Sequence, residues 1–218
     1  WKAPFTDIEL TLSPWDAFFE HHPELQLVLK DKEGAIIAHA NSLPISWSKK
    51  LDQLPEEGWS WTLKQVQKEN KGAKNILCAM SITVCKNRRG EGLSRMMLKE
   101  LKNMAKEKGF EHLIVPVRPN HKWKWPLISM QEYIKKTRSD QLCYDPWLRT
   151  HQRIGGVILS ICSRSMQFSA TQTQWNNWLK QPIPKEGSIE IPNMLFPLEL
   201  KNGHGYYNEA NVWVLHPL

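Results

Sequence analysis

The sequence has few cysteines and no apolar run of membrane-spanning length. Its 218 residues include four cysteines, and their spacing matches neither a zinc site nor a C-x-x-C redox motif. No apolar stretch approaches the ~20 residues of a membrane-spanning helix, no basic and apolar leader opens the chain, and no N-x-S/T sequon occurs. These absences predict free thiols in a reducing, cytoplasmic compartment, no metal site and no membrane partner.

Length and composition predict one globular domain. Hydrophobic residues make up 41% of the chain and charged residues 23%, which is ordinary for a globular protein and excludes a low-complexity or disordered chain. A chain of this length fits a single domain over 1–218. Because it opens on Trp1 rather than Met, we expect the domain to belong to a larger, multidomain chain.

The positive charge is concentrated in one segment. The formal net charge is +7, yet residues 62–124 alone carry 15 Lys and Arg against 5 Asp and Glu. These basic residues alternate with helix-spaced apolar residues rather than with aromatic stacking pairs, so the segment predicts a small polyphosphate ligand and no nucleic acid. The alternative is a solvated, lysine-rich surface, to which Lys122 and Lys124 would belong.

Apolar periodicity predicts a β–α–β unit in the middle of the chain. The run at 76–85 contains no Gly or Pro and is partly β-branched, which is typical of a buried strand. After a glycine-containing loop, apolar residues recur at helical spacing from Leu93 to Ala105, and Gly109 is placed to end that helix. A second buried strand covers 112–117, so the two strands should be close in one sheet.

Shorter elements are predicted on both sides of this unit. Proline at a first helical position and a capping Asp145 mark two of the helix starts. We expect helices at 15–21, 62–69, 146–153 and 171–179, and strands at 24–31, 35–45, 157–161, 166–170 and around Ile189, Leu198 and Val212.

The most informative element is the loop Arg89-Gly90-Glu91-Gly92 between the strand and the long helix. Glycine lets the backbone approach a phosphate closely, and the free N–H groups of the first helical turn then point at the anion. The loop is not a P-loop, and it lacks the third glycine and the later acidic residue of a dinucleotide site. It predicts a phosphate-bearing ligand, unless it is only a glycine-rich connection.

The strand, the sequence Arg88-Arg89-Gly90-Glu91-Gly92-Leu93 and the helix together resemble motif A of the GNAT acyltransferase superfamily. Asn87 occupies the first position of that motif, where the family has Gln or Arg. The resemblance implies an α/β fold with one mixed, twisted sheet, splayed between the strands at 76–85 and 112–117, and helices on both faces. It also implies that coenzyme A binds to Ile82, Val84, Arg89, Gly90, Glu91, Gly92, Leu93 and Ser94.

Further segments, over roughly 79–216, resemble the GNAT-like loading domains of curacin-type polyketide synthases. They include 117–122, 144–151, Gly155, 165–166 and 211–213. Such domains decarboxylate malonyl-CoA and pass the acetyl group to an acyl carrier protein. The resemblance implies an acetyl-CoA or malonyl-CoA substrate and two kinds of partner, a carrier protein and neighbouring domains of a larger chain.

The same resemblance implies four catalytic residues. His151 would be the acid that protonates the carbon left by decarboxylation, and Asn120 stands where these domains have Thr. Arg164 would hold the malonyl carboxylate, and Trp15 would form a wall of the pocket. A buried structural histidine is the alternative for His151.

Two other functions stay open. An amine N-acetyltransferase must deprotonate an ammonium of pKa ~10. The strand at 76–85 offers no carboxylate or histidine, so a base such as Glu132 or Glu209 would have to reach the thioester from elsewhere. The last alternative is a catalytically inactive module, because Asn87 and Asn120 both depart from the family patterns.

Overall fold

The computed structural model describes residues 15–66 and 73–218, with side chains from Phe18 onward. Its helices are α1 (Trp15–His21), α2 (Gly58–Gln65), α3 (Leu93–Glu107), α4 (Met130–Ile134), α5 (Pro146–Arg153) and α6 (Gln172–Leu179). Its strands are β1 (Leu27–Lys30), β2 (Ile36–Ile45), β3 (Ile76–Val84), β4 (His112–Val117), β5 (Val157–Thr171), β6 (Gly187–Ile189), β7 (Leu198–Lys201) and β8 (His204–Pro217). Within these ranges no helix is long and apolar enough to cross a membrane.

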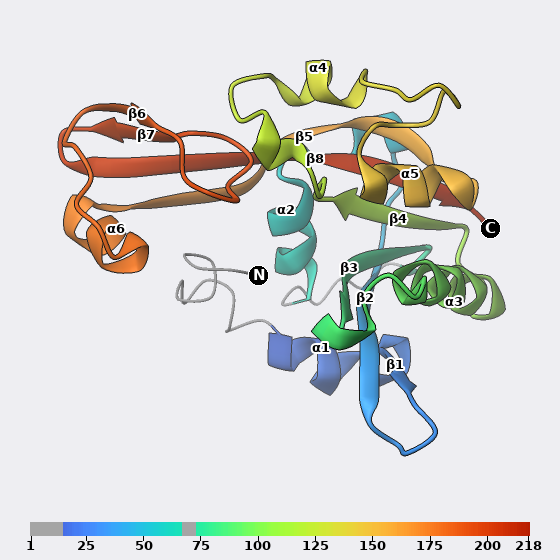
Figure 1. Cartoon of the computed structure of the whole chain (residues 1–218). Helices are drawn as coiled ribbons and strands as arrows, with labels where there is room; N and C mark the ends of the chain where they lie inside the picture. Colours follow the sequence, from blue (N-terminus) through green and yellow to red (C-terminus); the bar gives the residue numbers. More distant parts are fainter. Residues whose placement is uncertain (1–14, 67–72) are drawn as a thin grey trace.

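The strands form one mixed sheet in the order β1-β2-β3-β4-β8-β7-β6, and β5 pairs with β8 (Figure 1). β3 and β4 run parallel, as the β–α–β pattern predicts, and the other pairs are antiparallel. β8 pairs with β5 along one edge. On its other edge it pairs with β7 in its first half and with β4 in its second half.

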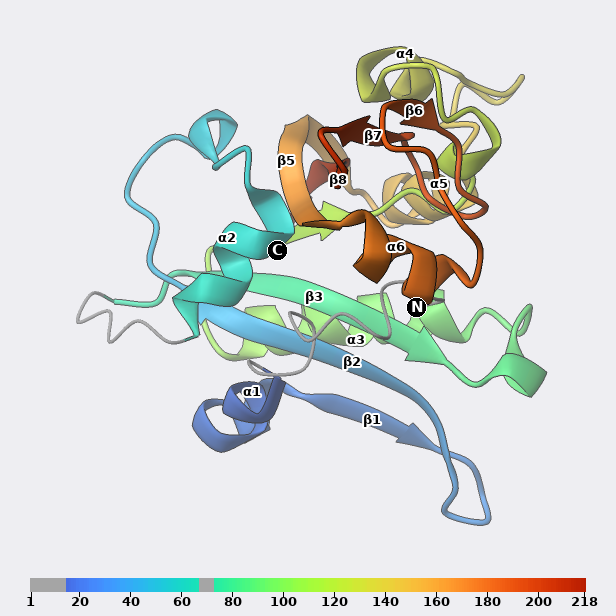
Figure 2. The same cartoon turned by 90° about the vertical axis from the view of Figure 1, so that its left-hand side faces the viewer.

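Helices cover both faces of this sheet, which confirms the predicted architecture. α3 and α5 pack over one face, where the apolar stripe of α3 meets the buried residues of β3, β4 and β8. α2 packs over the opposite face, and Figure 2 shows α2 and α3 on opposite sides of β3. The stripe consists of Leu93, Met97, Leu98, Leu101, Met104 and Ala105.

The far halves of β5 and β8 extend away from the body of the sheet and carry α6, β6 and β7 (Figure 1). This arm has its own apolar contacts. Trp175 of α6 donates from Nε1 to the Gly205 carbonyl at 3.1 Å, and Phe168 stacks on Tyr207 at 6.2 Å between ring centroids. The two strands predicted at 157–161 and 166–170 are therefore one long strand.

That strand is continuous because a bulge absorbs the irregular stretch between its halves. The pairing of β5 with β8 jumps from Cys162 to Met166, and the three residues between them bulge towards α2. There the Arg164 backbone N–H donates to the Glu56 carbonyl at 3.0 Å. A bulge increases the local twist and re-aims side chains, so this one docks α2 onto the sheet.

Two predicted boundaries are wrong. The helix expected from Thr62 begins at Gly58, because Pro55 and Gly58 initiate the helix instead of separating it from the previous strand. The strand expected at 24–31 is shorter, because Pro23–Leu25 forms a 3-10 turn that precedes β1. The end of the predicted helix at 69 lies outside the described residues.

The close contact between α2 and the β5 bulge predicts an unusual cost for Gly58→Ala. Gly58 has φ +37°, and a Cβ there would lie 2.6 Å from Cys162 Cβ and 2.8 Å from Ser165 Oγ. Gly34 also has positive φ, at +86°, but a Cβ there meets nothing within 4 Å. We expect Gly34→Ala to lower the free energy of unfolding by about 1 kcal/mol and Gly58→Ala by about 3 kcal/mol.

Urea denaturation of both variants measures this difference. Equal losses in the two variants would mean that backbone strain alone accounts for Gly58, and that α2 moves away from β5 at little cost.

Candidate active site

The candidate site lies where β3 separates from β4. These parallel strands pair at only three positions, from Ile76 opposite His112 to Cys78 opposite Ile114. Just beyond, the pairing of β3 with β2 skips Met80, which forms a bulge. A bulge bends its strand, so the two strands diverge and leave a cavity of about 590 Å³ between and above them. The predicted splay is therefore confirmed.

The divergence leaves one edge of β3 without a strand partner among the described residues. Residues 79–84 all line the cavity, and their backbone groups on this edge have no ladder to join. Buried N–H and C=O groups require hydrogen-bond partners. An extended ligand that contains amide groups can supply them as an added strand would.

The glycine loop, which lies between β3 and α3, closes one end of the cavity. Gly90 has φ +90° and Gly92, at the start of α3, has φ +79°. A Cβ at either position would meet nothing within 4 Å. Glycine is therefore required here for the positive φ of the backbone, and the space next to the start of α3 stays open. The first N–H groups of α3 have no acceptor within the helix. The loop and the N-terminus of this fifteen-residue helix are an arrangement that can bind an anion.

Most of the residues predicted to bind CoA surround this one cavity. Seven of the eight line it, namely Ile82, Val84, Arg89, Gly90, Gly92, Leu93 and Ser94. Glu91 does not, and its carboxylate accepts two hydrogen bonds from Arg88, at 2.7 and 2.8 Å. The geometry brings the seven together, and their contact with CoA stays a prediction.

The cavity reaches both faces of the sheet. On the α3 side, Leu93 and Val115 belong to the core beneath α3 and α5, and Trp147 of α5 completes the wall. On the α2 side, Trp59 and Met80 belong to the core beneath α2. A ligand held by the glycine loop and a second ligand entering from the α2 side can therefore meet between β3 and β4.

A polar cluster on the α2 side contains Asn211, Ser165 and Trp59. Asn211 of β8 is 1% exposed, and its Nδ2 donates to Ser165 Oγ at 2.9 Å. The same oxygen accepts the Trp59 backbone N–H at 3.0 Å. Asn211 lines the cavity, and its Oδ1 has no hydrogen-bond partner among the described residues. This oxygen is itself enclosed by the protein, and an unsatisfied buried carbonyl costs about 1–3 kcal/mol.

Next to this cluster lies a buried ion pair. Arg118 donates from Nε and Nη2 to the two carboxylate oxygens of Glu209, at 2.8 and 2.9 Å, and the Tyr207 hydroxyl donates to the same carboxylate at 2.7 Å. Burial opposes the charge on Arg118, but Glu209 raises its pKa. Burial, and then the charge of Glu209, raise the pKa of Tyr207. Glu209 is therefore already engaged by two strong donors.

The alternative base Glu132 also lies elsewhere. It forms a capping box with Ser129 at the exposed start of α4. The described residues that line the cavity include no Asp, Glu or His. In the described part of the chain, no group of three or more His, Cys, Asp or Glu residues is close enough to hold a metal ion.

His151 is buried beside the cavity wall rather than in it. Its Nδ1 lies 2.8 Å from Nε2 of His216, and its ring contacts Trp147 at 4.5 Å between centroids. His216 pairs with Leu113, at the end of β4 remote from the opening. Burial, and then the charge of His216, lower the pKa of His151 well below its ordinary value. His151 is thus a neutral imidazole at neutral pH, and its proposed proton transfer stays a prediction.

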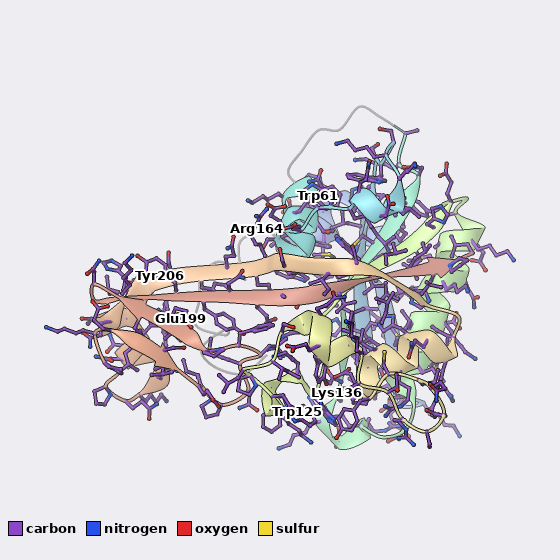
Figure 3. The ribbon with its side chains drawn as sticks, turned by 90° about the horizontal axis from the view of Figure 1, so that it is seen from above. Trp61, Trp125, Lys136, Arg164, Glu199 and Tyr206 are labelled. Atoms are coloured by element: carbon purple, nitrogen blue, oxygen red, sulfur yellow. The ribbon has the colours of Figure 1, made fainter. Side chains whose placement is uncertain are left out.

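The other predicted catalytic residues are dispersed. Asn120 lines the cavity. Arg164 lies in the β5 bulge, half exposed, where it donates to Glu57 at 2.7 Å and approaches Glu56 at 3.6 Å. Figure 3 shows Arg164 on the α2 side of the long ribbon of β5 and β8. The side chain of Trp15 lies outside the described residues. Of the three whose side chains the structure describes, Asn120 alone lines the cavity.

Lys122 is not part of a solvated face, so for this residue the alternative given by the sequence is wrong. It is fully buried, and its Nζ donates to the carbonyls of Trp125 at 2.8 Å and Leu195 at 2.9 Å. The ammonium also lies 4.0 Å from the ring centroid of Phe196. Burial lowers its pKa to about 8. Lys122 therefore joins the loop after β4, which carries Asn120, to the segment before β7.

Sequence reasoning did not identify the polar cluster on the α2 side. Ser165 and Asn211 were noted only inside segments that resemble a family, and they are 46 positions apart. Trp59 precedes the predicted start of its helix. The only local signal is the polar Asn211 in the otherwise apolar run of β8, and a strand with one polar residue is too common to be diagnostic.

Comparison with known proteins agrees with this geometry, although no family model matches the chain. Over 214 residues the chain is 31% identical to arginine N-acetyltransferase avaD of Aspergillus versicolor, covering 87% of this chain and 73% of that protein. Among solved structures, the loading GNATL domain of CurA from Lyngbya majuscula has a TM-score of 0.57 and 17% identity, covering 90% of this chain and 77% of that one. The GphF GNAT-like decarboxylase in complex with isobutyryl-CoA has a TM-score of 0.58 and 15% identity, covering 94% and 88%.

Two findings assign the class of this protein. Its sheet opens between two parallel strands beside a glycine loop, and an acetyltransferase is similar to it along most of this chain. The chain belongs to the GNAT superfamily and is an acyltransferase of that type. The predicted membership of the superfamily, and the likeness to its GNAT-like loading domains, are confirmed.

The buried His151 and His216 pair predicts loss of stability in acid. Burial lowers the pKa of His216 to about 4 in the folded protein, against about 6.5 when unfolded. Between these values the unfolded chain binds a proton that the folded chain excludes. The contribution of His216 to the free energy of unfolding is therefore fully present above pH 6.5. It falls by about 3 kcal/mol as the pH approaches 4.

Urea denaturation between pH 7 and pH 4.5 measures this slope, and His216→Gln should reduce it. His204→Gln, which removes an exposed histidine of the same strand, controls for the loss of an imidazole. A wild-type free energy of unfolding that stays constant over this range would contradict the assignment.

Proposed function

We propose that the protein transfers an acetyl group from acetyl-CoA to a nitrogen of arginine or of an arginine-containing small molecule. The observation that carries the proposal is the single cavity that runs from the glycine loop, through the opening between β3 and β4, to the α2 side. The acceptor class comes from the arginine N-acetyltransferase, which is similar along 87% of this chain.

The α3 side of the cavity suits coenzyme A. Its phosphates would bind the N–H groups at the start of α3, beside Arg89, where a cation adds to the positive end of the helix. Its pantetheine arm carries two amide groups, which match the unpaired backbone edge of residues 79–84. The thioester would then lie near Met80, where the cavity passes to the α2 side.

The α2 side suits a nitrogen acceptor. Trp59 lines the cavity there, and an aromatic ring attracts guanidinium and ammonium groups. Because no Asp, Glu or His is among the described lining residues, the acceptor nitrogen must lose its proton to water or to a group outside this set before it attacks. Attack on the thioester carbon expels the CoA thiolate, which takes up the proton that the nitrogen releases.

S-acetyl transfer to an acyl carrier protein, with decarboxylation of malonyl-CoA, is the second candidate. The two solved structures with TM-scores of 0.57 and 0.58 favour it at the level of fold, and Asn120 lies at the cavity. It requires His151 and Arg164 at the acyl group. The first is buried beside the cavity, and the second is paired with Glu57 at the surface.

Mass spectrometry of two parallel reactions separates these functions. One contains acetyl-CoA with L-arginine, and the other contains malonyl-CoA with a phosphopantetheinylated acyl carrier protein. We expect N-acetylarginine in the first and an unmodified carrier in the second. Acetylation of the carrier alone would replace the proposal by the second candidate, and no product in either reaction would overturn both.

The glycine loop predicts a second outcome, with a matched control in the same helix. Gly92 at the start of α3 and Gly109 after its end have nearly equal φ values, +79° and +76°, and a Cβ at either meets nothing within 4 Å. Substitution by alanine should therefore lower the free energy of unfolding by about 1 kcal/mol at each of the two positions. Only Gly92 lies at the cavity, so Gly92→Ala should weaken acetyl-CoA binding about tenfold and Gly109→Ala should not.

Isothermal titration of acetyl-CoA into the folded variants tests this expectation. Equal affinities for the two variants would place the phosphates away from the loop.

A further inference from the structure

Lys122 is a buried cation whose hydrogen bonds all go to backbone carbonyls. The residue is fully buried, and its Nζ donates to Trp125 at 2.8 Å, to Leu195 at 2.9 Å and, in a longer bond, to Pro126 at 3.4 Å. An ammonium has three donors and no acceptor, so these bonds use its whole capacity. The Phe196 ring, with its centroid 4.0 Å from Nζ, adds a cation–π contact. Such complete pairing is what a buried charge requires.

These carbonyls belong to two segments that are far apart in the sequence. Trp125 and Pro126 directly follow the 3-10 turn η5 (Lys122–Lys124), whereas Leu195 is 73 positions from Lys122 and lies before β7. Leu195 is itself held by β8, because its backbone N–H donates to the Tyr207 hydroxyl at 3.0 Å. The ammonium therefore joins the loop after β4 to a segment that is already fixed to the sheet.

The loop that Lys122 holds forms part of the cavity wall. Asn120, two residues earlier, lines the cavity. Between them the His121 backbone N–H donates to the Asp145 carboxylate at 2.8 Å, and Asp145 caps α5. The chain next to Asn120 is thus held on two sides, to α5 by its backbone and to the segment before β7 by the ammonium. Loss of either contact would let Asn120 move relative to β3.

We propose that Lys122 is a positioning residue for acyl transfer, whose ammonium fixes the part of the cavity wall that carries Asn120. Because it is fully buried, Lys122 acts through this loop and not on the substrate. The assignment goes beyond the proposed function, since it holds for either acceptor, and only its first kinetic test uses L-arginine. Reactive geometry must hold to within about 0.5 Å, and a misplacement of about 1 Å costs up to about 100-fold in rate.

The charge of Lys122 allows positioning to be separated from stability. Burial lowers the pKa of Lys122 to about 8, while the charge of Glu209 on β8 raises it. Arg118 and Tyr207 bind the same carboxylate. In the unfolded chain the pKa of a lysine is about 10.5. Between these two values the unfolded chain binds a proton that the folded chain has lost, so deprotonation of Lys122 increases the free energy of unfolding.

Deprotonation has the opposite effect on the hold over the loop. A neutral amine keeps two hydrogens for three carbonyls, and its hydrogen bonds lose the contribution of the charge. It also loses the electrostatic attraction to the Phe196 ring. Above pH 8 the fold therefore gains stability from Lys122 while the position of Asn120 becomes less fixed.

The test compares two variants of the same turn. Lys122→Met removes the ammonium and keeps a side chain of similar length. Lys124→Met is the control, because Lys124 is exposed and its ammonium lies 5.8 Å from the ring centroid of Trp123. At pH 7 we expect Lys122→Met to lower kcat for L-arginine about tenfold, with acetyl-CoA affinity within about twofold of wild type. Lys124→Met should retain wild-type kcat, and wild-type kcat in Lys122→Met would overturn the assignment.

The pH dependence supplies a result that a merely structural lysine would not give. The ratio of wild-type kcat to Lys122→Met kcat cancels the ionisation of the acceptor, which both enzymes share. We expect this ratio to fall from about tenfold at pH 7 to about threefold at pH 9.5, while urea denaturation shows the wild type gaining stability relative to the variant. A ratio that stays constant or rises would overturn the assignment. If Lys122→Met does not fold, Lys122→Gln, which keeps two N–H donors without a charge, replaces it.

Hydrogen exchange gives a further result that needs no acceptor. At pH 7 we expect the amides of 118–122 and 193–196 to exchange at least about threefold faster in Lys122→Met than in wild type, and to be unchanged in Lys124→Met. Unchanged exchange in both segments would overturn the role of Lys122 whatever the acceptor. Failure of the wild-type enzyme to acetylate L-arginine would instead overturn the proposed function, and the kinetic comparison would then use malonyl-CoA and the carrier protein.

Discussion

The structure depends on one interruption of strand pairing. β3 and β4 share only three paired positions, and at the bulge of Met80 they begin to separate. If the ladder continued, it would satisfy the backbone of residues 79–84 and leave no cavity. Because it stops, this backbone is available to a ligand, the glycine loop lies at the open end, and the two faces of the sheet communicate through one space.

The elements around this opening were predictable because their signals are local. The apolar run of β3, the glycine loop, the stripe of α3 and the run of β4 follow one another in the sequence, and each has a recognisable pattern. Even the separation of the strands followed from the resemblance to a family. The start of α2 was missed because Pro55 and Gly58 carry the same signal whether they break a chain or begin a helix.

The acceptor side of the site was not predictable, because it is assembled from distant positions. Asn211 meets Ser165 only through the bulge in β5, and Trp59 joins them from a helix more than a hundred positions before Ser165. Tertiary packing likewise buries His151 beside the cavity wall, and it surrounds Lys122 with three carbonyl groups rather than water. Residue type indicates which chemistry is possible, whereas contacts between distant segments determine which group meets the substrate.

The continuity of β8 constrains where the chain tolerates changes in length. The same strand pairs with β7 in the arm and with β4 beside the cavity, and successive side chains of a strand point to opposite faces. One residue inserted between Tyr206 and Asn211 would reverse the parity of every position beyond it, unless a new bulge absorbed the change. Residues added to the turn between Lys201 and His204 would leave that parity intact. The arm can therefore change in length at its tip, but not along the strand that joins it to the site.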